Sequence, residues 1–170
     1  MLAATKDLLD ALRTAMQGER TGHEFYKVAA ATTKDPQGQK VFAQLAAEEL
    51  AHLEFLRKHY ESIADNGELA KGVTLGDANA LDLEHPIFSA DFKSRIKEAH
   101  FEMSALAIAV QLELNSIHLY REQATNAAEV QVQQLFRRLV EWECGHYDAL
   151  IRQQQELQET YWSAAGFSPF

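Results

Sequence analysis

Residues 49–52 read Glu-Leu-Ala-His, and this short stretch decides how the rest of the chain is understood. It lies in a helical pattern over 41–63, where apolar residues recur in steps of three and four, as on the core-facing stripe of a bundle helix. Glu49 and His52 occupy two positions of that stripe, where a core usually has leucine. Positions three residues apart share one helix face, so both side chains are expected to point inward.

The same pattern returns 94 residues later, where positions 143–146 read Glu-Cys-Gly-His. The helices that precede the two motifs match at the same separation: Glu19 pairs with Glu113, and Tyr26 pairs with Tyr120. No gap interrupts the match. The chain is therefore interpreted as two helical hairpins related by a pseudo-twofold axis, which together form one four-helix bundle.

Periodicity and breaker residues predict an all-α fold in a single domain, 1–170. The hairpin repeats cover about 6–64 and 103–160, and a long crossover covers about 65–102. Their helices are expected at about 6–31, 36–64, 103–127 and 129–160. A structureless loop as long as the crossover is uncommon in a compact domain. The crossover is therefore expected either to run the length of the bundle or to carry a short helix, with 89–97 as the candidate.

Composition and charge exclude several classes of protein. Hydrophobic residues make up 46% and charged residues 24%, as in ordinary globular proteins. The formal net charge of −9, without a basic stripe, argues against a nucleic-acid partner. The single cysteine, Cys144, excludes a disulfide framework and favours a reducing, cytoplasmic setting. The start of the chain turns polar too early for a signal peptide, and no apolar run approaches the ~20 residues of a membrane helix.

Each of the four helical stripes is broken by an acidic residue, and two of them also by a histidine. These residues are Glu19, Glu49, His52, Glu113, Glu143 and His146. A bare carboxylate in a core is costly unless a positive group meets it. Two divalent metal ions would offset four carboxylates, so the pattern predicts a dinuclear metal site. Oxygen ligands with one imidazole per metal suit iron(II) or manganese(II), so two iron ions per chain are expected, with manganese or zinc as alternatives.

This pattern resembles that of the ferritin-like superfamily, and within it the rubrerythrin-like di-iron carboxylate proteins and the bacterioferritins. The resemblance covers all four helices, about 9–157. It implies terminal metal ligands Glu19 and Glu113, bridging ligands Glu49 and Glu143, histidine ligands His52 and His146, and tyrosines Tyr26 and Tyr120 that hydrogen-bond a ligand carboxylate. The two tyrosines are equally well explained as core residues whose hydroxyls find another partner.

The chain departs from rubrerythrins proper in two respects. Those proteins carry a rubredoxin-type domain that holds iron with four cysteines, and this chain has one cysteine. They also carry an extra glutamate on the third helix, whereas Val110 and Ser116, three residues either side of Glu113, are not acidic. The set of six ligands is similar to that of the bacterioferritins.

Three functions are compatible with such a site. The first is a di-iron oxidoreductase that reduces peroxide or dioxygen with electrons from an external donor protein. The second is a ferroxidase or iron-storage protein, and the third is a bundle that metal stabilises without catalysis. The aromatic end of the chain, 161–170, is expected to fold back on the bundle or to dock on a second subunit, which makes a homo-oligomer possible.

The remaining candidates have simpler interpretations. His23 lies one turn from Glu19, but its counterpart in the second hairpin is Ile117, which favours a packed structural histidine. His59 is expected to mark the wetter end of the bundle. Three acidic residues fall outside the apolar stripes and are expected on solvated faces: Glu48, Glu54 and Glu141.

Overall fold

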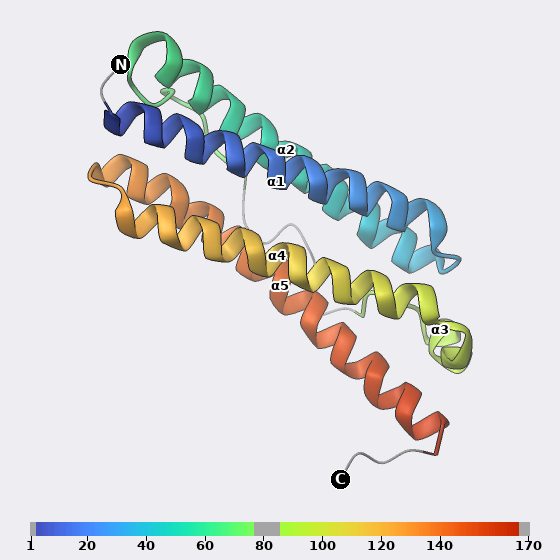
Figure 1. The fold of residues 1–170 in the computed structure, drawn as a ribbon. Helices are drawn as coiled ribbons and strands as arrows, with labels where there is room; N and C mark the ends of the chain where they lie inside the picture. Colours follow the sequence, from blue (N-terminus) through green and yellow to red (C-terminus); the bar gives the residue numbers. More distant parts are fainter. Residues whose placement is uncertain (1–2, 77–85, 167–170) are drawn as a thin grey trace.

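Four long helices dominate the computed structural model, which describes residues 3–76 and 86–166 (Figure 1). They are α1 (Ala3–Thr32), α2 (Pro36–Asn66), α4 (His100–Asn126) and α5 (Val130–Ala164), with a short α3 (Ala90–Ser94) and a 3₁₀ turn η1 (Ile96–Glu98) between the second and the third. The described part of the chain contains no strand. The predicted all-α fold is confirmed, and the predicted ends of the long helices lie within a few residues of those observed.

Local signals in the sequence explain where α2 begins and ends. The Asp35 carboxylate accepts a hydrogen bond of 2.8 Å from the Gly38 N–H, and Pro36 occupies the first helical position, where its missing N–H costs nothing. At the other end, Gly67 adopts φ 79°, and its N–H donates to the Ile63 carbonyl. The short turn before Asp35 returns α2 antiparallel to α1.

The four helices are arranged as two packed hairpins. Helix α1 packs along α2, helix α4 packs along α5, and α1 also contacts α4. Helix α3 lies at the end of the bundle opposite to the C-terminal end of α2 (Figure 1). The crossover therefore spans the length of the bundle and also carries a short helix, and α4 consequently runs in the same direction as α2. Residues 77–85 of the crossover lie outside the described residues.

The described end of the crossover is fastened to the bundle by polar groups. The Ile87 N–H donates to Gln153 Oε1 at 2.7 Å, and the Ser89 hydroxyl donates to Asp35, the residue that caps α2. Phe88 is buried against Gly38, where a Cβ would lie 2.6 Å from the phenyl ring. These contacts fix the position at which the second hairpin begins.

The apolar core forms two clusters, one toward each end of the bundle. Matching residues of the two hairpins are fully buried in them: Leu12 with Leu106, and Phe42 with Phe136. Along each long helix, the predicted acidic residue lies between these clusters. The acidic residues are thus flanked on both sides by apolar side chains that exclude water.

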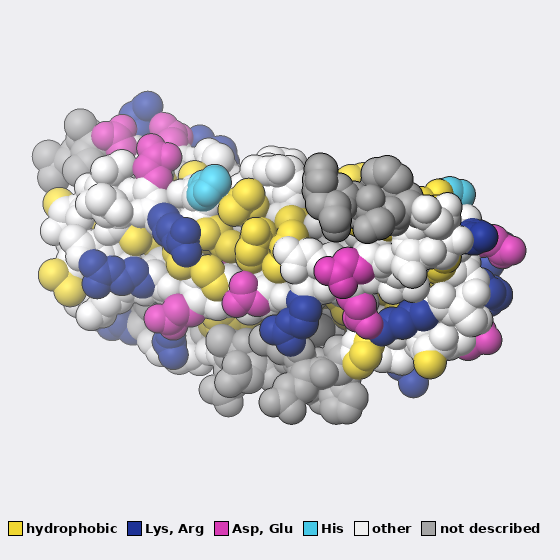
Figure 2. All heavy atoms as spheres, turned by 90° about the horizontal axis from the view of Figure 1, so that it is seen from below, with side chains coloured by type: hydrophobic (Ala, Val, Ile, Leu, Met, Phe, Trp, Pro, Cys, Tyr) yellow, Lys and Arg dark blue, Asp and Glu magenta, His cyan; other side chains and the backbone are white. Residues whose placement is uncertain are grey.

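The exterior is mixed in charge. Figure 2 shows one face on which Lys and Arg side chains alternate with Asp and Glu around an apolar area. Among the residues that the structure describes, no helix combines the length and apolar character needed to cross a membrane.

Candidate metal centre

All six predicted ligands meet at the middle of the bundle, and each is at most 5% exposed. They form two groups whose possible ligand atoms lie within 4.8 Å of one another: Glu19, Glu49, His52 and Glu143 in the first, and Glu49, Glu113, Glu143 and His146 in the second. Glu49 and Glu143 belong to both groups. The helical spacing explains this convergence, because each Glu-x-x-His motif places its carboxylate and imidazole on one face.

Both histidines turn the same ring nitrogen toward the carboxylates. Nδ1 of His52 lies 3.2 Å from Glu19 Oε2 and 3.1 Å from Glu143 Oε1. Nδ1 of His146 lies 3.3 Å from Glu49 Oε1 and 3.6 Å from both Glu113 Oε2 and Glu143 Oε2. The two halves of the centre therefore have the same local design.

Several polar atoms at the centre have no hydrogen-bond partner among the described residues. They are Glu49 Oε1, both carboxylate oxygens of Glu143, His146 Nδ1 and His52 Nε2. Buried polar atoms rarely stay unpaired, because leaving water without a new partner is costly. Except for His52 Nε2, these atoms face the space that the carboxylates share. Cations placed there would be ligated by these atoms, so the residues present fit a metal site of oxygen and imidazole donors.

The pKa values of two carboxyl groups are raised. Burial, followed by the negative charges of Glu19 and Glu143, raises the pKa of Glu49 well above its usual value. Burial and the charge of Glu143 raise the pKa of Glu113 to about 8. Without a cation, Glu113 therefore retains its proton at neutral pH, where ordinary carboxyl groups have lost theirs, and the pKa of Glu49 is shifted in the same direction.

The remaining charges balance one another. Burial opposes ionisation of Glu143, but His52 and His146 hold the pKa of this carboxyl well below its usual range. Burial would likewise lower the pKa of both imidazoles, yet the carboxylates that surround them raise it well above the usual value. The protons held by these carboxyl and imidazole groups thus offset the charge of the acidic residues, and bound cations would take the place of those protons.

Both predicted tyrosines are fully buried, and each hydroxyl donates to a carboxylate of the other hairpin. Tyr26 on α1 donates to Glu113 Oε1 on α4, and Tyr120 on α4 donates to Glu19 Oε1 on α1. Burial, and then the nearby carboxylates, raise the pKa of both phenols well above the usual value, so the hydroxyls stay protonated as donors. The tyrosine partners are therefore two of the predicted terminal ligands.

Glu48 was expected on a solvated face, and that prediction is wrong. Its side chain is 11% exposed, and Oε2 lies 2.7 Å from Nε2 of His146. The matching residue of the second hairpin is Trp142, whose ring meets that of His52 nearly edge to face, with centroids 5.1 Å apart. The sequence contained one signal for this difference: positions 48 and 142 immediately precede the two glutamates shared by both groups, and they differ in chemical type.

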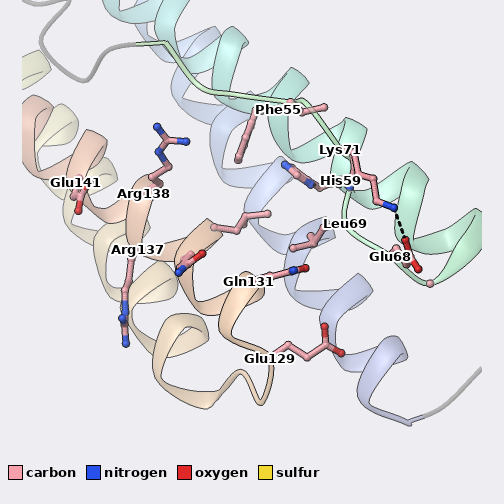
Figure 3. Close-up of a pocket in the computed structure, with 15 residues that line it drawn as sticks. Phe55, His59, Glu68, Leu69, Lys71, Glu129, Gln131, Arg137, Arg138 and Glu141 are labelled. Atoms are coloured by element: carbon pink, nitrogen blue, oxygen red, sulfur yellow. Dashed lines mark hydrogen bonds and ion pairs between the residues drawn. The ribbon is translucent and has the colours of Figure 1, made fainter.

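The other two histidines with sequence-based expectations lie apart from the centre. His23 is partly buried, with Nδ1 2.7 Å from the Ala46 carbonyl oxygen, as expected of a structural histidine. His59 was expected at a solvent-exposed end of the bundle, but it is only 5% exposed. The crossover covers it, and the Ala70 N–H donates to its Nδ1. Figure 3 shows His59 beside a cavity of about 880 Å³, near the Lys71–Glu68 ion pair. None of the six predicted ligands lines that cavity.

A smaller recess, of about 200 Å³, connects the centre with the surface between α1 and α4. Glu49 and Glu113 form its inner end, and its other lining residues are mostly small or polar: Gln17, Gly18, Thr21, Gly22, Leu112, Asn115 and Ser116. A Cβ on Gly22 would lie only 2.7 Å from Glu49 Oε2. The absence of a side chain at Gly22 therefore gives the Glu49 carboxylate its space beside the recess.

Comparison with known proteins agrees with this geometry. No curated protein sequence and no solved structure matched the chain. A protein-family model described as Rubrerythrin matches residues 10–152, a range that includes all six predicted ligands and both tyrosines. Because the match covers most of the 170 residues, the chain belongs to the rubrerythrin family.

Proposed function

We propose that this protein is a di-iron carboxylate oxidoreductase that reduces peroxide or dioxygen with electrons from an external donor protein. The observation that carries the proposal is the overlap of the two ligand groups in Glu49 and Glu143. Two groups that share two carboxylates suit a pair of adjacent ions rather than two separate ones. Membership of the rubrerythrin family, whose members typically bind iron, supports iron as the metal.

The six residues divide naturally between two ions. Glu19 and His52 would hold one, Glu113 and His146 would hold the other, and Glu49 and Glu143 would span both. Two iron(II) ions, when bound, would supply one electron each, which is what the two-electron reduction of peroxide to two water molecules requires together with two protons. The protein then has to orient the ligands and admit a small oxidant.

The tyrosines orient the terminal carboxylates. Tyr120 donates to Oε1 of Glu19 and leaves Oε2 facing His52 at 3.2 Å. Tyr26 does the same for Glu113, whose Oε2 faces His146 at 3.6 Å. A hydrogen bond to one oxygen fixes the direction in which the other donates, and outer partners of this kind strengthen metal binding.

Access to the centre is narrow and polar. The recess between α1 and α4 ends at Glu49 and Glu113, while apolar clusters close the two ends of the bundle. A molecule of the size of peroxide or dioxygen fits such a route, whereas a bulky organic substrate does not. Within these 170 residues there is one cysteine, too few for a cysteine-ligated iron centre, and a separate protein is proposed as the electron donor.

The proposal is tested by anaerobic loading with iron(II), followed by metal analysis and visible spectroscopy after addition of peroxide and then of air. Two irons per chain, with rapid appearance of the absorption of an oxidised di-iron centre on adding peroxide, are expected. Uptake of iron far beyond two per chain would point to storage instead. Tightly held metal that reacts with neither oxidant would show that the metal only stabilises the fold.

A further inference from the structure

The two histidines of the metal centre have different outer neighbours at one pair of matching positions. Glu48 and Trp142 each precede a bridging glutamate, and each contacts the histidine of the opposite hairpin. The other partners are matched: both halves have a terminal glutamate held by a tyrosine, and both share the bridging carboxylates. A difference between the two metal positions would therefore originate largely at positions 48 and 142.

Glu48 prepares His146 for a metal. Its Oε2 lies 2.7 Å from Nε2 of His146, and its other oxygen accepts a hydrogen bond of 2.9 Å from Gln44. With Nε2 as the donor to Glu48, the neutral ring presents the lone pair of Nδ1 to the carboxylates. A carboxylate partner of this kind fixes the tautomer and the ring orientation, and it makes the ligating nitrogen more basic.

Trp142 does none of this for His52. Its indole offers no acceptor, because the ring nitrogen is only a donor, and His52 Nε2 has no hydrogen-bond partner among the described residues. A proton on Nε2 would leave a buried donor unpaired, whereas a proton on Nδ1 can be donated to Glu19 Oε2 at 3.2 Å. A metal on Nδ1 would therefore leave the His52 ring with its proton on a buried Nε2 that has no acceptor in the described part of the chain, which disfavours ligation by His52.

We propose that the two metal positions have unequal affinity: the ion at Glu113 and His146 is held tightly, and the ion at Glu19 and His52 is held weakly and exchanges. Glu48 is the positioning residue that creates the difference. This inference rests on the metal centre of the proposed function and adds an order of occupancy to it. Loss of an outer carboxylate partner typically lowers metal affinity by about 10–100-fold, which is the difference expected between the two positions.

The test is calorimetric titration of the metal-free protein with manganese(II), which binds without redox chemistry. The wild type should show two steps whose dissociation constants differ by about 10–100-fold. Glu48→Leu should weaken the tight step by about the same factor and bring the two steps together. Trp142→Glu should instead strengthen the weak step, because it places a carboxylate beside His52. Glu141→Leu, which removes an exposed carboxylate of the same helix, should change neither step.

The position that fills first is identified by NMR with diamagnetic zinc(II), because direct ligation shifts the Nδ1 signal of the histidine that binds the ion, whereas manganese(II) would broaden both rings, whose centroids are only 5.7 Å apart. Substoichiometric zinc should shift the Nδ1 signal of His146 before that of His52, even if calorimetry resolves only one step. Two equal steps in the wild type, an unaltered tight step in Glu48→Leu, or an earlier shift of the His52 signal would overturn the inequality while leaving the metal centre intact. Failure of the wild type to bind any metal would overturn the proposed function as well. Because the wild type and Glu48→Leu are sufficient to test the proposal, the test does not depend on correct folding of Trp142→Glu.

Discussion

The position of the Glu49 carboxylate, which both ligand groups share, depends on the absence of a side chain at Gly22. A Cβ on Gly22 would lie 2.7 Å from Glu49 Oε2, closer than real contacts allow. The atom that it would meet is the far end of a flexible side chain, so the carboxylate would move and the helices would stay in place. Gly22 therefore influences the metal centre more than it influences the fold.

Gly22→Ala should reduce metal binding without unfolding the protein. The added methyl group displaces the Glu49 carboxylate from the position at which it serves both ligand groups, so fewer than two metal ions per chain are expected. The intrinsic gain of alanine over glycine in a helix, about 1 kcal/mol, should keep the free energy of unfolding close to that of the wild type. Metal analysis and thermal denaturation of the metal-free protein measure the two effects.

Gly18→Ala is the matched control, one helical turn earlier. A Cβ at Gly18 meets only Ser116 Oγ, at 4.0 Å, so the same chemical change should leave metal binding at the wild-type level. An equal loss of metal in both variants would show that helix geometry, and not the space around Glu49, is responsible.

Tyr120→Phe should weaken metal binding by about 10–100-fold, because it removes the hydroxyl that holds Glu19 Oε1. The phenyl ring keeps the packing of the buried residue, so the helical content should not change. Titration with manganese(II) measures the affinity. Tyr60→Phe, which removes a hydroxyl bonded to Arg13 at the surface, is the control. Equal affinities in Tyr120→Phe and the wild type would contradict an orienting role.

The positions of the six candidate ligands could be predicted because helical spacing is a local property. A glutamate or histidine that falls on an apolar stripe must point into the core, whatever the rest of the chain does. Glu48 lies one residue off the stripe of α2, and its burial depends on how closely α5 approaches. That approach is a matter of tertiary packing, which the periodicity of one helix does not contain.

At the scale of elements, the interface between α1 and α4 sets access to the centre. The two helices contact each other, yet small residues leave a recess of about 200 Å³ that ends at Glu49 and Glu113. Gly18 lines this recess, whereas the matching position of α4 is Leu112. Because Gly18 has no side chain, the α1 side of the recess is less filled than the α4 side, where Leu112 lies.

Gly18→Leu should slow the reaction of the iron-loaded protein with peroxide by an order of magnitude or more, while two irons per chain remain bound. The leucine copies the residue already present at the matching position, and nothing within 4 Å except Ser116 Oγ opposes its Cβ. Stopped-flow spectroscopy measures the rate. Ala107→Leu, an equivalent enlargement at an exposed position of α4 outside the recess, should react at the wild-type rate. An unchanged rate in Gly18→Leu would mean that the oxidant enters elsewhere.

The long helices and their caps follow from proline, glycine and periodicity, so their bounds could be predicted closely. The course of the crossover could not be predicted in this way. Its described end is held by hydrogen bonds from Ile87 to Gln153 and from Ser89 to Asp35, and these pairs are 66 and 54 residues apart in sequence. No local pattern indicates such partners, although the short helix predicted within 89–97 is present, and Ser89 caps its start.

At the scale of the whole molecule, the interior holds an excess of acidic groups, and this makes stability depend on pH. Glu49 and Glu113 have raised pKa values, Glu113 about 8, and the two site histidines have raised values as well. The metal-free folded state therefore binds more protons than the unfolded chain above about pH 5. Its stability must fall as pH rises, because these groups lose their protons through their folded-state pKa values. The lowered pKa of Glu143 acts in the opposite direction only at acid pH.

The melting temperature of the metal-free protein should therefore decrease from pH 6 to pH 9. For a chain of this size, a loss of 2 kcal/mol corresponds to about 4–8 °C. The manganese-loaded protein should show a smaller decrease or none, since metal replaces the protons and its affinity rises with pH. Differential scanning calorimetry at matched ionic strength measures both curves. A metal-free protein that becomes more stable toward pH 9 would contradict the charge balance described for the centre.

The crossed hydrogen bonds of the two tyrosines have a consequence for the symmetry of the molecule. Since Tyr26 serves Glu113 and Tyr120 serves Glu19, neither hairpin completes half of the centre without the other. A symmetric dimer of identical hairpins could form the same crossed hydrogen bonds. Its symmetry, however, would require the same residue type at the two positions that Glu48 and Trp142 occupy here. A single chain that holds both hairpins has no such constraint, so its matching positions can differ.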